Sequence, residues 1–241
     1  MEFMPHDAPL VILLFLGACF GLGVTGLLVV YGLASGRRAL VKYGSAAALA
    51  AAGMYAALLL TTSLASEEKV LALGEQKYFC EVDCHEAYSV AGVTRAKTLG
   101  TPPSEVTAAG AFYVVSVKVW FDEKTVSSRR PRDLPLIPNP RTVSVVDARG
   151  RRFTASPQGQ AALAQAGRKV IALTRPLRPG ESYTTDIVFD LPGDAEDPRL
   201  FITTADWVTR FLIGHENTLF HKKVFFGLAP QSSAAALARP E

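Results

Sequence analysis

Residues 112–121 read FYVVSVKVWF, and this stretch indicates a β-strand within a soluble domain. Val115, Val117 and Val119 alternate with Ser116 and Lys118, which is the two-residue period of a strand that is buried on one face. Short apolar segments separated by turn residues lie on both sides of it. We therefore expect further strands near residues 70–73, 77–82, 87–94, 142–147, 152–154, 169–173, 183–189, 200–203, 207–213 and 222–228.

One short helix is expected among these strands. Ser156 is suited to cap its N-terminus, Pro157 to occupy its first position and Gly167 to end it. Many short strands with regular turns are typical of a β-sandwich. The sequence thus predicts an all-β sandwich over residues 67–228, followed by an extended C-terminal tail over residues 229–241.

Turn motifs add a resemblance to a known family. The strand 112–121 is followed by DARG at 147–150, LRPGES at 177–182 and IVFDLP at 187–192. This order resembles bacterial extracellular immunoglobulin-like domains, a broad family of mostly unknown function, and the likeness spans residues 75–204. It implies an immunoglobulin-like sandwich. Because its motifs are turn and core signatures, it implies no particular chemistry.

The N-terminal part of the chain has a different composition. The whole chain of 241 residues has 20% charged residues and a mean hydropathy of +0.21, yet residues 8–36 and 43–66 contain no ionisable acid or base. A bilayer core of about 30 Å requires about 20 apolar helical residues. The sequence therefore predicts a two-helix transmembrane hairpin over residues 1–66, with spans at about 9–35 and 43–65. The first span lacks the basic flank of a cleaved signal peptide.

The loop between the two spans predicts their orientation. Arg37, Arg38 and Lys42 lie there, and basic residues close to span ends favour the cytoplasmic side. We expect an inner (cytoplasmic) membrane protein whose termini and β domain are periplasmic, with membrane lipids as partners. The net charge of +3 is too small to indicate nucleic acid, and no basic recognition motif is present.

Small residues in the spans suggest helix contacts. Gly17 and Gly21 lie four residues apart, a spacing that lets two helix backbones approach closely. Either the two spans pack on each other there, or this face contacts another integral membrane subunit. Because neither span holds Asp, Glu, Lys, Arg or His, we expect an anchor without a proton relay or an ion site.

The densest group of chemically active side chains is Cys80, Cys84 and His85. Four interpretations are open: a Cys80–Cys84 disulfide, unlinked thiols, a metal site completed by His215 or His221, or covalent haem on a variant of the C-x-x-C-H motif. We expect the disulfide. Positions four apart in a straight strand lie about 13 Å from each other, so the bridge requires a bend near residues 82–83. No cofactor is expected, with haem or copper as the alternatives.

A proline-rich segment at residues 123–141 carries several arginines. Arg129, Arg130 and Arg132 lie among prolines that prevent a regular helix or central strand. The segment is either a solvated loop or an extended arm that contacts an acidic partner.

No sequence motif indicates catalysis. The chain has no phosphate-binding loop, no zinc-protease motif and no nucleophile elbow. We expect a non-catalytic accessory subunit of a membrane complex that carries out photosynthetic or respiratory electron transport. This subunit would brace an extracytoplasmic partner such as a cytochrome. The alternatives are a metal- or haem-carrying electron-transfer protein and a free-standing sensor or adhesion module.

Overall fold

The computed structural model describes residues 8–81 and 85–229. The chain forms two compact units. The first is built from Met1–Glu67 and Asp206–Lys223, and the second from Glu68–Ala205 and Val224–Glu241. Each unit thus combines two stretches that are not continuous in the sequence.

The first unit contains the helical hairpin. Helix α1 (Ala8–Ala34) and helix α2 (Arg38–Leu64) are both long and apolar enough to cross a membrane, which matches the two predicted spans. At 1.5 Å per residue each helix is about 40 Å long. The turn between them contains Gly36, whose φ of +66° lies in the left-handed region that favours glycine.

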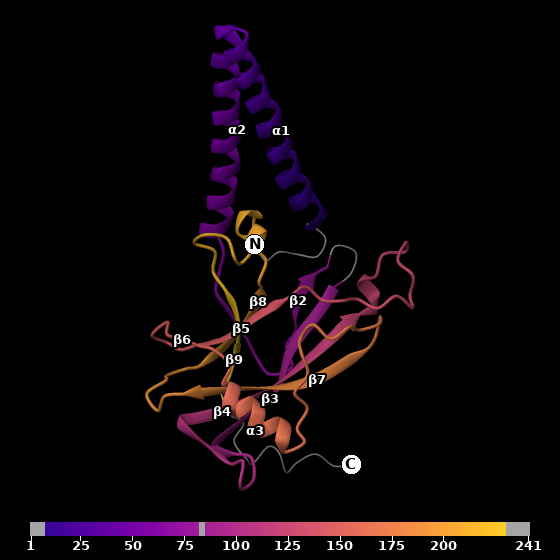
Figure 1. Ribbon diagram of the computed structural model, residues 1–241, viewed down its shortest axis with the longest axis vertical. Helices are drawn as coiled ribbons and strands as arrows, with labels where there is room; N and C mark the ends of the chain where they lie inside the picture. Colours follow the sequence, from indigo (N-terminus) through magenta and orange to yellow (C-terminus); the bar gives the residue numbers. More distant parts are fainter. Residues whose placement is uncertain (1–7, 82–84, 230–241) are drawn as a thin grey trace. The chain divides into compact units, whose positions relative to one another are not determined.

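The two helices approach each other most closely near this turn (Figure 1). A Cβ atom added to Gly44 would lie 2.9 Å from Cγ2 of Val29, and one added to Gly32 would lie 3.0 Å from Cβ of Leu40. These two glycines, both buried, therefore permit the contact.

The segment 206–223 belongs to the same unit as the hairpin. The Tyr55 hydroxyl of α2 donates a 2.7 Å hydrogen bond to the carbonyl of Phe211, and the amide of Lys222 donates one of 2.8 Å to Oγ of Ser66. The domain limits expected from the sequence had placed this segment in the sandwich, so here the structure differs.

The predicted strand over 207–213 is wrong. The chain forms a 3-10 helix, η2 (Trp207–Phe211), because the carboxylate of Asp206 accepts a hydrogen bond from the amide of Val208 and caps a turn. The carbonyl of Asp206 also accepts a 2.5 Å bond from Oγ1 of Thr209.

The second unit is a β-sandwich, as the sequence predicted. Within the described residues, one sheet has five strands in the order β1-β9-β8-β5-β6, and the other has four in the order β2-β3-β4-β7. The strands are β1 (Lys69–Leu71), β2 (Lys77–Cys80), β3 (His85–Leu99), β4 (Val106–Asp122), β5 (Arg141–Val146), β6 (Arg152–Phe153), β7 (Ser182–Leu191), β8 (Arg199–Thr204) and β9 (Val224–Gly227).

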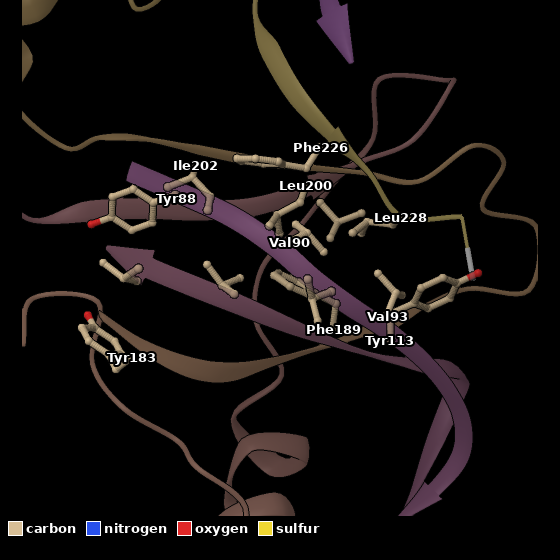
Figure 2. Close-up of a cluster of buried hydrophobic side chains, with 14 of the residues drawn as sticks. Tyr88, Val90, Val93, Tyr113, Tyr183, Phe189, Leu200, Ile202, Phe226 and Leu228 are labelled. Atoms are coloured by element: carbon tan, nitrogen blue, oxygen red, sulfur yellow. The ribbon is translucent and has the colours of Figure 1, made fainter. Parts of the chain in front are cut away.

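The core lies between the two sheets and is centred on β4. Val115, Val117 and Val119 are fully buried, which confirms the alternation seen in the sequence. Figure 2 shows side chains of the two sheets meeting in this core, among them Val90 of β3 and Ile202 of β8. Burial of these apolar side chains is the main stabilising contribution to such a domain.

Helix α3 (Pro157–Gln165) packs on the outer face of the four-stranded sheet against β7 and β4. As predicted, Ser156 caps it: its Oγ accepts a 3.2 Å hydrogen bond from the amide of Gly159. A Cβ at Gly159 would lie 2.6 Å from Cγ1 of Val188, so only glycine allows the helix to lie this close to the sheet.

The expected strand over 169–173 is absent, although this segment runs beside β7. The hydroxyl of Thr185 accepts a 2.8 Å hydrogen bond from the backbone amide of Ile171 and donates one of 2.7 Å to the carbonyl of Ile171. These side-chain bonds replace the backbone ladder of a strand. A short 3-10 turn, η1 (Glu123–Thr125), follows β4.

Candidate functional site

The hairpin between β2 and β3 carries the cysteine motif. Cys80 is the last residue of β2 and pairs with His85, the first residue of β3. Strands β2 and β3 are therefore antiparallel neighbours in the four-stranded sheet. Cys84 lies outside the described residues, so the disulfide stays a prediction.

A buried cluster of charged side chains includes Glu81, the residue directly after Cys80. The Arg141 guanidinium of β5 forms ion pairs with Glu81 and, at 3.3 Å, with Glu86 of β3. The Tyr88 hydroxyl donates a 2.7 Å hydrogen bond to Glu86, and the side-chain amide of Asn139 donates one to Glu81. Because Arg141 belongs to one sheet and Glu86 to the other, the cluster joins the two sheets.

Glu86 has the most perturbed carboxyl group of this cluster. One guanidinium faces two carboxylates, and no partner for Oε1 of Glu86 is found among the described residues. Burial raises the pKa of Glu86 to about 7, while the Tyr88 hydrogen bond and the charge of Arg141 lower it by less. Burial also raises the pKa of the Tyr88 hydroxyl. Glu86 is therefore the group here that can exchange a proton near neutral pH.

A second buried cation joins the same two sheets. The ammonium of Lys77 on β2 donates hydrogen bonds of 2.7 Å to the carbonyl of Ile202 and 3.1 Å to that of Val224. It also lies 5.3 Å from the ring centre of Phe79 and 4.9 Å from that of Phe201. Lys77 and the cluster around Arg141 therefore act as polar ties within the sandwich.

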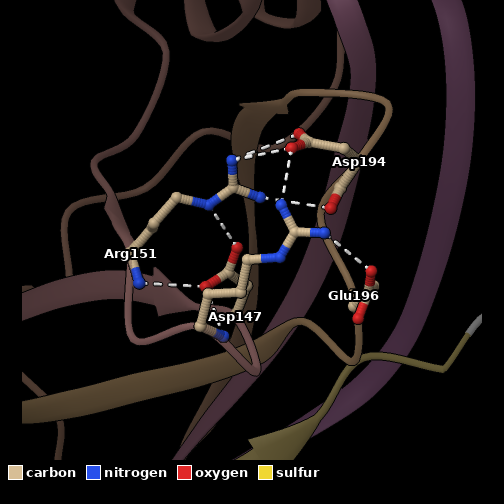
Figure 3. A network of polar contacts seen from close by, with 5 residues as sticks. Asp147, Arg151, Asp194 and Glu196 are labelled. Carbon is tan, nitrogen blue, oxygen red and sulfur yellow. Dashed lines mark hydrogen bonds and ion pairs between the residues drawn. The ribbon is translucent and has the colours of Figure 1, made fainter.

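A surface network stabilises the turn after β5 (Figure 3). The carboxylate of Asp147 accepts hydrogen bonds from the amides of Arg149 and Arg151 at 3.0 and 2.9 Å, and from Nε of Arg151 at 2.7 Å. Both arginines also form ion pairs with Asp194, and Arg149 forms one with Glu196. This DARG turn, which carried part of the family resemblance, is thus fixed to the connection between β7 and β8.

The two glycines predicted to contact a partner lie away from the closest helix contact. A Cβ at Gly17 or Gly21 would meet no described atom within 4 Å. The internal packing of the hairpin uses Gly32 and Gly44 instead. The Gly17–Gly21 face is therefore not filled by α2.

The arginine-rich segment is anchored to the sandwich. Leu136 is buried and forms backbone hydrogen bonds with Leu177 in both directions, at 2.7 and 3.0 Å. Arg130 donates to the carbonyl of Pro135, whereas Arg129 and Arg132 are exposed. The segment is thus a loop with a fixed base that presents arginines at the surface.

The two C-terminal histidines, His215 and His221, hold local turns. The ring of His215 accepts the amide of Asn217 at 3.0 Å, and Nδ1 of His221 lies 2.6 Å from the carbonyl of Lys222. Across residues 8–81 and 85–229, no group of three or more His, Cys, Asp or Glu side chains is placed to hold a metal ion.

Sequence reasoning missed the polar ties. Glu86 stands in the pattern EAYSV and Lys77 follows a polar turn, so both resemble ordinary surface residues. The available signal was that Glu86 and Tyr88 share the face of β3 that also carries Val90. The contact of Arg141 with these two side chains depends on how the two sheets pack against each other, which the sequence does not reveal.

Comparison with known proteins yields only distant likenesses. No protein-family model matches the chain, and no curated sequence matches it. Among solved structures, the secreted protein MPT63 of Mycobacterium tuberculosis is 11% identical with a TM-score of 0.40, over 67% of this chain and 97% of that one. A conserved hypothetical protein of Bacillus anthracis is 14% identical with a TM-score of 0.37, over 54% and 88%.

A third solved structure, an uncharacterized β-sandwich protein of Clostridium difficile 630, is 8% identical with a TM-score of 0.32, over 68% of this chain and 97% of that one. At these scores the fold assignment rests on the strand order of the chain itself. That order defines a β-sandwich joined to a hairpin of two apolar helices.

Proposed function

We propose that this protein is a non-catalytic accessory subunit of a membrane complex, anchored by its helical hairpin. The observation that carries the proposal is the surface of α1. From Ala8 to Ala34 it has no Asp, Glu, Lys, Arg or His, and large apolar side chains such as Leu13, Phe20 and Leu27 are 66–75% exposed. A surface of this kind is stable in lipid or against other apolar helices.

The hairpin offers a face for another subunit. Close packing of membrane helices depends on small residues, and the Gly17–Gly21 face is left open by α2. In this proposal, a helix of the parent complex packs there. The remaining apolar surface contacts lipid.

The sandwich supplies the extracytoplasmic part of the proposal. Its buried charges serve as ties between the sheets, while Arg129 and Arg132 are exposed on an anchored loop. A loop with a fixed base loses little entropy when it binds an acidic surface. We assign the domain to the periplasmic side, where it braces a partner such as a cytochrome.

Extraction of native membranes with a mild detergent, followed by gel filtration and absorption spectroscopy, tests this function. We expect the protein to elute with a large complex, and cytochrome or chlorophyll bands in that fraction if the complex is energy-transducing. Elution as a small colourless particle would contradict the accessory role. A haem or copper band in the isolated chain would favour electron transfer.

A further inference from the structure

The segment 206–223 exposes an unusual number of large apolar side chains for its length. Trp207, Phe211, Leu219 and Phe220 are each 47–67% exposed. The rings of Trp207 and Phe211 contact each other edge to face, with centres 5.8 Å apart. An apolar cluster of this kind usually marks a surface that is covered in the functional state.

The Leu219–Phe220 turn is held in an exposed position by its neighbours. Thr218 and His221 on either side are buried. Oγ1 of Thr218 donates a 2.8 Å hydrogen bond to the carbonyl of Leu212. The backbone amide of His221 donates one of 3.2 Å to the carbonyl of Thr218. Phe220 itself has a φ of +65°, a conformation that bulky residues rarely adopt. Strained residues of this kind concentrate at functional sites.

The position of the segment on α2 indicates what covers it. It is bonded to α2 at Tyr55 and again just beyond the helix at Ser66, so it lies along the last turns of that helix. If α2 spans the membrane, its end is where the helix meets the lipid headgroups. Tryptophan and other aromatic residues are enriched at that level because they present both apolar and polar groups.

The polar groups of the segment fit the same depth. Arg210 and Lys222 are exposed, and basic side chains at an interface can reach lipid phosphates while their stems remain in apolar surroundings. The Phe211 carbonyl is satisfied by the Tyr55 hydroxyl, which removes part of the cost of placing backbone near hydrocarbon.

From these observations we infer that the segment 206–223 is a membrane-interface element, whose Trp207, Phe211, Leu219 and Phe220 side chains enter the bilayer that holds the hairpin. This inference rests on the proposed membrane anchoring. It adds a third membrane contact, far from the two spans in the sequence.

Quenching by brominated lipids tests the inference on the full chain. The sequence contains two tryptophans, so Trp120→Phe leaves Trp207 as the only emitter, and Trp207→Phe leaves Trp120 of β4 as the matched control. Each variant is reconstituted into phosphatidylcholine–phosphatidylglycerol vesicles with brominated acyl chains. We expect a loss of Trp207 emission relative to unbrominated vesicles, and no loss for Trp120.

Resistance to carbonate extraction is measured on the same vesicles. Unquenched Trp207 in carbonate-resistant protein would overturn the inference and leave the anchoring intact, since Trp207 would then face water or a second copy of the chain. Release of the protein by carbonate would instead overturn the anchoring itself. The second variant is Phe220→Asn in the Trp120→Phe background, which keeps a residue that tolerates positive φ. It should shift Trp207 emission to longer wavelength, and unchanged emission would contradict the placement of Phe220 in the bilayer.

Discussion

Arg141 of β5 and Glu86 of β3 form an ion pair of 3.3 Å across the interior of the sandwich, and the same guanidinium also binds Glu81. Both carboxylates contact the same guanidinium in a site with almost no contact with water. Burial there favours the protonated form of Glu86.

The first prediction is a loss of stability as the pH rises. The pKa of Glu86 is raised from 4.5 to about 7, so between these values the folded state binds a proton that the unfolded chain releases. The contribution is complete below about pH 4.5 and is lost as the pH rises through 7. It amounts to at most about 3 kcal/mol. Chemical unfolding of the purified protein between pH 5 and 8 measures it, with Glu86→Gln as the control that should flatten the profile.

Replacing the shared cation should destabilise the sandwich strongly. Arg141→Met leaves Glu81 and Glu86 buried without their counter-ion, and we expect a loss of about 3–5 kcal/mol in the free energy of unfolding. Arg149→Met is the matched control, because its ion pairs are exposed and should contribute less than about 1 kcal/mol. Equal losses in the two variants would contradict the role of Arg141 as a tie between sheets.

The cysteines give a third prediction. We expect Cys80 and Cys84 to be bridged and Cys19, on the exposed surface of α1, to be reduced. Thiol alkylation with and without reductant, read by mass spectrometry, distinguishes these states. Loss of the bridge should cost only about 1–2 kcal/mol, because the loop is short. Free alkylation of Cys80 in the native protein would exclude the bridge, and a mass increase of haem size would favour the haem interpretation.

The open glycine face gives a fourth prediction. Gly21→Leu should reduce retention in the parent complex without affecting membrane insertion, because the added side chain blocks helix contact while it raises hydrophobicity. Gly23→Leu is the control: it lies in the same helix, a Cβ there also meets nothing within 4 Å, and the 100° step per residue places it on another face. Co-purification that is equal for both variants would show that the Gly21 face contacts lipid.

Orientation in the membrane is the fifth prediction. Cysteines introduced into a background without the native three, at Ser35 in the turn and at Ala229 after β9, should react with an impermeant thiol reagent from opposite sides of the membrane. We expect Ser35→Cys to be cytoplasmic because Arg37, Arg38 and Lys42 flank the turn. Cytoplasmic labelling of Ala229→Cys would reverse the orientation and remove the oxidising compartment on which the disulfide depends.

Sequence patterns predicted those elements whose cause is local. The uncharged runs predicted both long helices, and the alternation at Val115, Val117 and Val119 predicted the core strand. Ser156 predicted the start of α3. In each case the period or the cap is set by neighbouring residues and needs no knowledge of the rest of the fold.

The remaining features depend on contacts between distant segments. The strand expected over 207–213 failed because Asp206 caps a 3-10 turn, and the one over 169–173 because Thr185 replaces its ladder. The candidate site was incomplete for the same reason: Lys77 and Glu86 are buried only because the second sheet covers them. Periodicity carries no information on which partner a buried charge will find.

The order of strands in the five-stranded sheet has a mechanical consequence. The chain passes between the two units after Glu67, Ala205 and Lys223, and these crossings adjoin the start of β1, the end of β8 and the start of β9. The three strands are neighbours in the order β1-β9-β8. The three covalent connections to the hairpin unit therefore enter this sheet through three adjacent, hydrogen-bonded strands, so no single strand carries the whole attachment.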